Sequence, residues 1–365
     1  MQVIAFGLAE VDTRARYDDL FEACPHAYIQ QSTHWAEALQ GLGPDQPIFL
    51  LASEGGREFG GLPLYLYRGA PGSILTSVPY AGPLGGVFSR LDSDRERVYA
   101  ALLGEAQEIA RAHGCLALTI ISNPIDDDVD LYHRHLAPSV SLQNFTQIVD
   151  LDAVVSNGRL VLRNNKKGNP AATIKKAEAA GFSARLCSTS AEFEAWYTIH
   201  VQRATEIPTA PLDRRLAEHI WRDLGARGCS FLQLVMAGDE IAAGCLMVLH
   251  KRVCDVFAVS MNSAHASNAP NYLAVKAAML EMATRGVKMM NWQSSPRRGD
   301  GVYKFKRQWG SEEKPYYFLT KTFCEDERIL RLGAAGLRQA YPGHFVVPFG
   351  CFEAGTVAGT YLKGA

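Results

Sequence analysis

The sequence lacks any apolar run long enough to cross a membrane. A membrane-spanning helix needs about 20 consecutive apolar residues, and no stretch of the 365-residue chain approaches that length. The N-terminal residues also lack the basic segment and following apolar segment of a secretory signal. We therefore predict a cytoplasmic protein without a membrane span.

The sequence also has little net charge and no paired cysteine motif. With a formal net charge of −1 it has no general basic surface, so any contact with nucleic acid would need a local patch. The eight cysteines form no CxxC pair, and some lie in apolar runs, as Cys245 does. Buried, reduced thiols explain this pattern better than disulfides do. His133 and His135 lack the further ligands that a zinc site needs, so we predict no metal.

The chain is long enough for two domains, and its two halves resemble each other. The hydrophobic content of 47% and charged content of 21% are those of a globular protein. FLLASEGGREFGGLPLYLY resembles FLQLVMAGDEIAAGCLMVL, and AQEIARAHGCLALTIIS resembles MLEMATRGVKMMNWQSS. In each half the sequence pattern predicts, in this order, helices, a β-hairpin, a third strand, a loop, a helix and a buried strand.

This order of elements predicts the fold class and the domain boundaries. We expect an α/β fold of the α+β kind, with two tandem domains that each contain a mixed, mostly antiparallel sheet with one parallel crossover. We place the N-terminal domain at residues 1–155 and the C-terminal domain, which carries the presumed active site, at residues 156–325. Residues 326–365 form a C-terminal tail with one predicted helix.

The segment 287–319 mixes cationic with aromatic side chains. We predict a strand–loop–strand that lines a site for an anionic or acyl-bearing ligand. The alternative is an edge strand whose long cationic side chains lie over apolar neighbours. The cations are Arg297, Arg298, Lys304, Lys306 and Arg307, and the aromatics are Tyr303, Phe305 and Trp309.

A second basic cluster lies near the start of the predicted C-terminal domain. Its sequence, RNNKKGNPAATIKK, is polar and basic and leads into a predicted helix. Such a cluster contacts phosphates or forms a solvated face, and the sequence leaves both interpretations open. The cluster consists of Arg163, Lys166, Lys167, Lys175 and Lys176.

Four segments resemble motifs of the FemAB-like branch of the GNAT (Gcn5-related N-acyltransferase) superfamily. QQSTHWAEAL resembles the early Q-s-x-x-W helix, and NPAATIKKAEAAGF resembles the helix that opens the second domain. NAPNYLAVKAAMLEMATRG resembles a later P-x-x-L helix, and GDGVYKFKRQWG resembles the closing G-v-x-x-F-K-x-x-F/W-G signature. Together they cover roughly residues 28 to 320 in the family's order.

The resemblance implies a tandem GNAT fold with a cleft at the second domain or between the domains. FemAB proteins transfer an amino acid from aminoacyl-tRNA to an amine, and other members of the wider group use acyl-CoA. The family's F-K lysine falls on Lys306, which we predict to be catalytic, with Lys304 beside it. Relatives that build peptidoglycan carry a long helical arm in the second domain. No such insertion is apparent here, which argues against a cell-wall polymer as acceptor.

Amide formation sets the roles that we expect of these residues. Aminolysis of an ester or thioester needs a neutral amine, a stabiliser for the oxyanion and close positioning. Lys306 suits the stabiliser role, and neighbouring cations would lower its pKa so that it could also move a proton. The predicted substrate contacts are Asn291, Gln293, Ser294, Arg297, Arg298, Tyr303, Arg307, Trp309, Asn271 and Tyr272.

The loop before the helix predicted at Pro270 bears on the acyl donor. GNAT enzymes that use acetyl-CoA hold its pyrophosphate with a glycine-rich loop before a helix, whereas SAHASNAPNYL contains no glycine. We therefore predict an aminoacyl-tRNA donor, no bound cofactor, and an amine of a small molecule or peptide as acceptor. Acyl-CoA is the alternative donor, and a binding module without turnover is the alternative function. The predicted contacts to tRNA phosphates are Arg163, Lys166, Lys167 and Lys175.

Overall fold

A computed structural model of the protein describes residues 1–43, 45–77, 84–162, 170–206, 210–295, 297–324 and 326–348. The chain forms two compact units, one of Met1–Phe145 with Pro315–Ala365 and one of Thr146–Lys314. It passes between them twice, in strand β7 (Val140–Asp150) and in strand β15 (Glu312–Thr322). The second unit thus begins and ends earlier than residues 156–325, and the described residues after Lys314 belong to the first unit.

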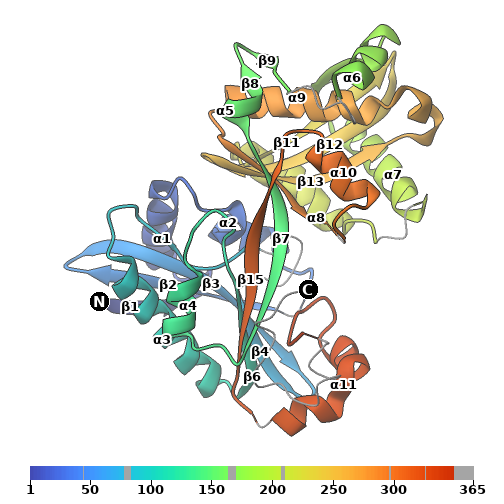
Figure 1. The fold of residues 1–365 in the computed structure, drawn as a ribbon. Helices are drawn as coiled ribbons and strands as arrows, with labels where there is room; N and C mark the ends of the chain where they lie inside the picture. Colours follow the sequence, from blue (N-terminus) through green and yellow to red (C-terminus); the bar gives the residue numbers. More distant parts are fainter. Residues whose placement is uncertain are drawn as a thin grey trace. The chain divides into compact units, whose positions relative to one another are not determined.

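The first unit is a sheet with helices on both faces (Figure 1). Its strand order is β1-β2-β3-β4-β6-β15, with β5 beside β3. Only β4 and β6 pair in parallel among these ladders. Its elements are β1 Gln2–Phe6, α1 Val11–Ala23, the 3₁₀ turn Ile29–Gln31, α2 Thr33–Leu39, β2 Gln46–Glu54, β3 Arg57–Gly69, β4 Gly72–Thr76, β5 Phe88–Ser89, α3 Arg95–Ala112, β6 Cys115–Ile121, α4 Val129–His135 and α11 Asp326–Ala340.

Small residues on β3 let helices approach both faces of this sheet. A Cβ atom at Gly60 would lie 2.3 Å from Val98 of α3, and one at Gly61 would lie 2.7 Å from Tyr17 of α1. The helix α2 begins as predicted, because the Trp35 backbone N–H donates to the Ser32 hydroxyl at 3.1 Å. Hydrophobic burial between the sheet and α3 forms one core of this unit.

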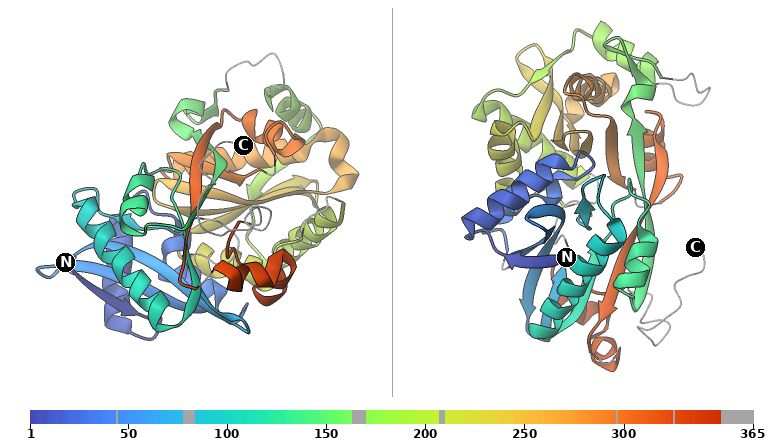
Figure 2. Two further views of the ribbon diagram at one scale, coloured as in Figure 1. Left: turned by 60° about the horizontal axis from the view of Figure 1, so that its bottom comes forward. Right: turned by 90° about the vertical axis from the view of Figure 1, so that its left-hand side faces the viewer.

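The second unit repeats the same order of elements, and Figure 2 gives two further views of the ribbon. Its strand order is β7-β14-β13-β12-β11-β10, in which only β13 and β14 pair in parallel. Its elements are α5 Leu151–Val154, β8 Val155–Ser156, β9 Arg159–Leu160, α6 Pro170–Ala179, β10 Ser183–Leu186, α7 Ser190–Glu206, α8 Arg214–His219, the π-helical turn Ile220–Leu224, β11 Ser230–Ala237, β12 Glu240–His250, β13 Val253–Met261, the 3₁₀ helix Ser263–Asn268, α9 Pro270–Thr284, β14 Met289–Ser294 and α10 Gly301–Arg307.

Side chains that alternate along β12 show which helix covers each face of this sheet. Cys245 is buried in the core beneath α9, whereas a Cβ atom at its neighbour Gly244 would lie 2.4 Å from Trp196 of α7. Helix α9 therefore covers one face and α7 the other, as Figure 1 shows. The predicted fold class, with tandem domains and mostly antiparallel sheets, is confirmed.

No helix in the described ranges is long and apolar enough to cross a membrane. No group of three or more His, Cys, Asp or Glu side chains in the same ranges could hold a metal ion.

Candidate functional site

The predicted strand–loop–strand is wrong in its middle part, because the residues that mix cations with aromatics form helix α10. Asp300 caps this helix, since its Oδ1 accepts from the Tyr303 backbone N–H at 2.7 Å. Tyr303 and Lys306 are buried, and their spacing of three residues places them on one side of the helix, while Trp309, just beyond the helix end, is buried too. The charged residues between them face outward.

Lys306 is the one cation of α10 whose side chain is buried. Its ammonium donates to the backbone oxygens of Gln293 at 3.0 Å and Ser294 at 2.7 Å, at the end of β14. An ammonium has three N–H donors, and the third has no acceptor among the described residues. Burial lowers the Lys306 pKa from 10.5 to about 8, and the Asp300 carboxylate opposes this effect.

The end of β14 is also the place where the parallel pair separates. β13 and β14 pair at three positions, the last of them Asp255 with Asn291. Beyond it β13 continues to Met261 and β14 to Ser294, and the described residues form no further ladder pairs between them. A strand separation of this kind leaves unpaired backbone groups that a ligand can contact.

In the first unit the corresponding parallel pair stays closed. The ladder of β4 with β6 runs to Thr76 and Thr119. The Ser77 backbone N–H then donates to Thr119 O at 3.0 Å, and the Ser77 hydroxyl accepts from the Ile121 N–H at 3.0 Å. The second unit therefore has the open pair of strands, and the only buried lysine among the described residues lies beside it.

Asn291 is buried completely, at the point of separation. Its Nδ2 donates to Asp255 Oδ1 at 2.7 Å, and its Oδ1 accepts from the Thr146 hydroxyl and from the Gln293 backbone N–H. These bonds fit Asn291 for orienting its neighbours better than for touching a substrate. Sequence reasoning missed Asp255 and Thr146, which lie 36 and 145 positions away.

Two of the predicted residues, Arg298 and Tyr303, form a group with Glu313 beside α10. Glu313 accepts from the Tyr303 hydroxyl at 2.6 Å and from Arg298 Nε at 2.8 Å. The bond to Glu313 is the main cause of a raised Tyr303 pKa, and the bonds from Tyr303 and Arg298 lower the Glu313 pKa. The side chains of Arg297, Lys304 and Arg307 are exposed.

Trp309 lies in the core, with 0% of its surface exposed. Its ring packs 5.7 Å from Tyr272 of α9 and 6.1 Å from Phe305, measured between ring centroids. Tyr272 also donates its hydroxyl to Gln308 Oε1 at 3.2 Å. These contacts fasten α10 to α9, so Trp309 and Tyr272 support the site from behind.

The remaining predicted contacts are more scattered. Asn271 is half-buried in the first turn of α9, and Lys175 is exposed on α6, where it lines a pocket of about 580 Å³ with Leu160 and Ile174. Arg163, Lys166 and Lys167 lie outside the described residues.

A histidine that the sequence gave no reason to select lies on the opposite face of the sheet from α9. His200 of α7 accepts from the Leu212 backbone N–H through Nε2 at 2.9 Å, so its ring hydrogen is on Nδ1. Nδ1 lies 2.9 Å from the hydroxyl of Ser260, which belongs to the part of β13 that has separated from β14. Burial lowers the His200 pKa and keeps the ring neutral.

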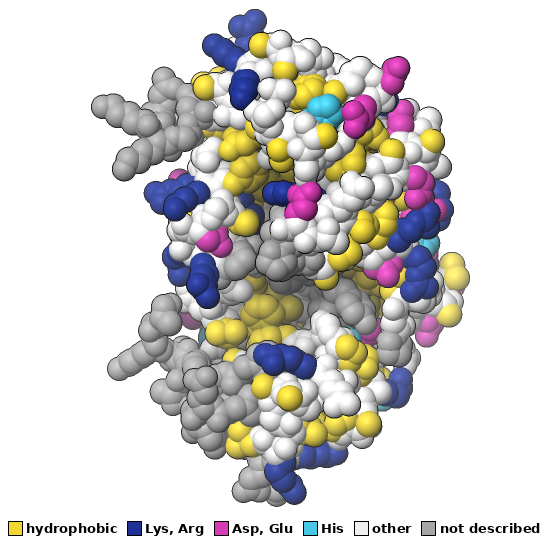
Figure 3. Space-filling view, turned by 90° about the vertical axis from the view of Figure 1, so that its right-hand side faces the viewer, with side chains coloured by type: hydrophobic (Ala, Val, Ile, Leu, Met, Phe, Trp, Pro, Cys, Tyr) yellow, Lys and Arg dark blue, Asp and Glu magenta, His cyan; other side chains and the backbone are white. Residues whose placement is uncertain are grey.

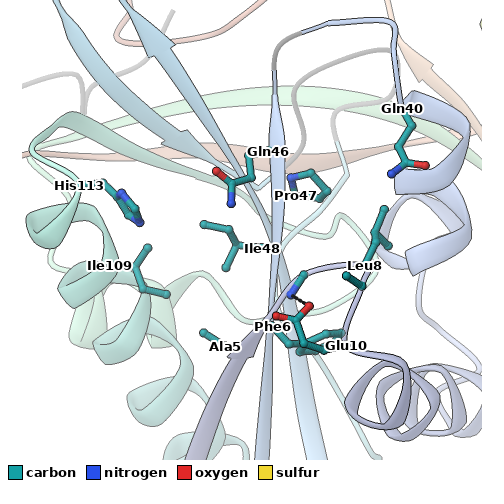
Figure 4. A pocket seen from close by; sticks show the side chains of 12 residues that line it. Ala5, Phe6, Leu8, Glu10, Gln40, Gln46, Pro47, Ile48, Ile109 and His113 are labelled. Atoms are coloured by element: carbon teal, nitrogen blue, oxygen red, sulfur yellow. Dashed lines mark hydrogen bonds between the residues drawn. The ribbon is translucent and has the colours of Figure 1, made fainter.

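The other described surfaces lack a buried cation of the kind found at Lys306. A pocket of about 550 Å³ in the first unit, drawn in Figure 4, contains no lysine or arginine, and its Glu10 accepts from the Gly7 N–H at 3.0 Å. On the face shown in Figure 3, cationic side chains are interspersed with acidic ones, so the described residues of that face form no continuous basic surface. This distribution agrees with the net charge of −1.

Comparison with known proteins gives matches to family models and to solved structures. Residues 165–307 match the family model described as an acetyltransferase (GNAT) domain. A search of the curated proteins gives no match.

Solved structures match over most of the chain. A crystal structure of FemX matches with a TM-score of 0.69 and 13% identity, over 87% of this chain and 97% of that one. The C-terminal domain of a putative lysylphosphatidylglycerol synthetase from Agrobacterium fabrum matches with a TM-score of 0.57 and 12% identity, over 92% and 99%. A tandem GNAT protein from the clavulanic acid biosynthesis pathway matches with a TM-score of 0.50 and 15% identity, over 88% and 98%.

At these identities the solved structures establish the fold, and the family model covers the unit that carries the open strand pair. Residues 165–307 are thus similar to a GNAT acetyltransferase domain, and over most of its length the chain has the fold of FemX and of the tandem GNAT protein.

Proposed function

We propose that the protein is an N-acyltransferase that transfers an aminoacyl group from aminoacyl-tRNA to an amine of a small molecule or peptide. The observation that carries this proposal is the buried ammonium of Lys306, held by two carbonyls where β13 and β14 separate. Its third N–H has no acceptor among the described residues and lies where these two strands separate. An aminoacyl-tRNA donor would place the reaction in the cytoplasm.

Amide formation at this site uses Lys306 as a fixed donor to the developing oxyanion. The amine nitrogen attacks the ester carbonyl carbon, and negative charge develops on the carbonyl oxygen. The third N–H of Lys306 stabilises that charge, and the carbon–oxygen bond to the ribose then breaks. The amine loses one proton and the departing oxygen gains one. Removing a single oxyanion donor typically lowers kcat about 100- to 1,000-fold.

The pKa of Lys306 determines how this role depends on pH. With a pKa of about 8, the side chain is about 90% protonated at pH 7, one unit below that value. An ammonium that stabilises an oxyanion must be protonated, so activity falls as pH rises through about 8. We call this fall the alkaline limb. A lysine that acted as general base would give the opposite slope.

The choice of donor rests on the segment before α9. This segment forms the 3₁₀ helix Ser263–Asn268 and contains no glycine, so it lacks the loop that holds a pyrophosphate in acetyl-CoA enzymes. Acyl-CoA is the second candidate donor, favoured by the description of the matching family model as an acetyltransferase domain. For tRNA, we expect phosphate contacts from the exposed Lys175, Arg297 and Arg307 of the second unit and from Arg163, Lys166 and Lys167.

A donor screen tests the proposal. Purified protein is incubated with charged tRNAs or acyl-CoAs and a mixture of amines, and amides are detected by mass spectrometry. Lys306→Ala should lower the rate about 100-fold or more. Lys321→Ala is the matched control, because Lys321 also donates to a backbone carbonyl, Leu136 O at 2.9 Å, but in the first unit.

The outcomes separate the candidates. Turnover with acyl-CoA and none with charged tRNA would reject the donor proposed here. Equal rates for Lys306→Ala and Lys321→Ala would remove Lys306 from the chemistry, and no turnover with any donor would favour a binding module. Retention of tRNA should weaken steeply with salt, and Lys166→Ala with Lys167→Ala should reduce that salt dependence.

A further inference from the structure

Gln293 has a backbone conformation that non-glycine residues rarely adopt inside a strand. Its φ is 60°, in the left-handed region, where a side chain meets steric conflict. The other described non-glycine residues with positive φ lie in turns or at helix ends, and Gln293 alone lies within a strand, β14. Backbone strain of this kind persists where surrounding structure holds it, and it gathers at functional sites.

The strain coincides with a β-bulge against β7. Asn291 pairs with Ile148, and the next pair is Ser294 with Thr146. Between these pairs, Trp292 and Gln293 of β14 face one residue of β7, Gln147, so β14 carries one extra residue there. Bulges redirect the strand locally and occur often beside active sites.

The bulge explains how one ammonium reaches two consecutive carbonyls. In an extended strand, successive carbonyls point in opposite directions, so one donor group reaches only one of them. Here Lys306 Nζ binds both Gln293 O and Ser294 O, at 3.0 and 2.7 Å. The left-handed turn at Gln293 brings these two oxygens, which we call the carbonyl pair, to one side of the strand.

Buried side chains hold the bulge in place. The Gln293 backbone N–H donates to Asn291 Oδ1 at 3.0 Å. Asn291 is itself fixed from β13 by Asp255 and from β7 by Thr146. Because all three side chains are at most 1% exposed, water cannot replace these bonds easily.

We propose that Gln293 is a positioning residue: its left-handed turn, anchored by Asn291, builds the carbonyl pair that aims the Lys306 ammonium at the acyl group. This inference rests on the proposed function, in which Lys306 acts as a protonated donor. Loss of the turn removes one carbonyl from Lys306. The ammonium is then less stabilised, its pKa falls, and its remaining N–H groups are no longer directed.

A matched pair of substitutions at Gln293 tests the role of the turn. Gln293→Gly and Gln293→Val both remove the side-chain amide, but glycine adopts positive φ readily whereas valine resists it. We expect Gln293→Gly to keep the alkaline limb at its wild-type pH. We expect Gln293→Val to lose at least tenfold in kcat and to move the alkaline limb of its residual activity to lower pH.

Thr146→Val is a second, milder variant, which keeps the side-chain shape and removes one bond to Asn291. We expect it to move the limb in the same direction by a smaller amount. Loss of folded protein alone would lower the rate at every pH and leave the limb in place, so the pH profile separates positioning from a merely structural role.

Each result decides one point. An unmoved alkaline limb in both Gln293→Val and Thr146→Val would overturn the inference, as would equal limb shifts in Gln293→Gly and Gln293→Val. Different results would contradict the proposed function: full activity of Lys306→Ala, or a wild-type protein whose activity does not fall above about pH 8.

Discussion

Replacing Lys306 by methionine should remove a pH-dependent contribution to the stability of the folded protein. Methionine has a similar length and apolar stem but cannot bind a proton. The Lys306 side chain is 8% exposed, and burial lowers its pKa from 10.5 to about 8. The unfolded chain, in which the lysine is hydrated, keeps the ordinary value.

The sign follows from the protons bound in each state. Between pH 8 and 10.5 the unfolded chain holds a proton on Lys306 that the folded protein has lost. The free energy of unfolding therefore rises with pH across this window. The unfavourable contribution of the buried, protonated Lys306 is fully present below about pH 8. The whole shift corresponds to about 3 kcal/mol, and the part between pH 7 and pH 10 to about 2.5 kcal/mol.

Urea unfolding of the wild type and of Lys306→Met at pH 7 and pH 10 measures this contribution. Other groups titrate over the same range, but they cancel in the difference between the two proteins. Relative to Lys306→Met, the wild type should gain about 2 to 3 kcal/mol on going from pH 7 to pH 10. Lys314→Met, at an exposed position, is the control, and its difference from the wild type should stay flat.

Two results would refute the reasoning. A difference that does not change with pH would mean that burial leaves the proton affinity of Lys306 as it is in water. A difference of the opposite sign would mean that the carbonyl pair stabilises the ammonium by more than burial destabilises it.

Three further substitutions probe the framework of the site. Trp309→Ala should cost about 3–5 kcal/mol in urea unfolding, because it empties a fully buried position between α10 and α9; a loss below 1 kcal/mol would contradict the packing described. Gly244→Ala should lower the melting temperature, because its Cβ atom would lie 2.4 Å from Trp196. Gly238→Ala is the control for backbone strain alone, because a Cβ atom there would meet no atom within 4 Å, while the φ of Gly238 is 62°. The lowered His200 pKa should make the wild type lose stability as pH falls below 6.5, since the unfolded chain then binds a proton that the folded ring resists; His200→Gln should abolish that slope, and an unchanged slope would show that another group causes it.

Much of the fold could be predicted from local patterns. Glycine turns with alternating apolar residues marked both hairpins, and Ser32 marked the start of α2. The repetition of these patterns indicated two similar units. Strands β1 and β7 were not predicted. β1 is short, and β7 contains several polar residues, so both carry a weak periodic signal.

The site was predicted only in part, and helix α10 shows why. Its cations and aromatics alternate from Tyr303 to Arg307, which suggests a strand, but its buried residues recur every third position. A search for that spacing through Tyr303, Lys306 and Trp309 would have indicated a helix. The left-handed turn at Gln293 and its anchors come from three strands, and no local pattern joins residues so far apart in sequence.

The double passage of the chain between the units has a consequence for synthesis on the ribosome. Residues 146–314 are contiguous and can complete their fold as soon as they emerge. The first unit, although it is made first, cannot finish its sheet until β15 arrives, because Phe318–Thr322 supply the antiparallel partner of β6. Apolar side chains of β6 and α3 then wait for about 200 further residues, at about 5–20 residues per second. The order of completion is therefore the reverse of the order of translation, and the N-terminal unit is the one whose apolar surface stays uncovered while it waits.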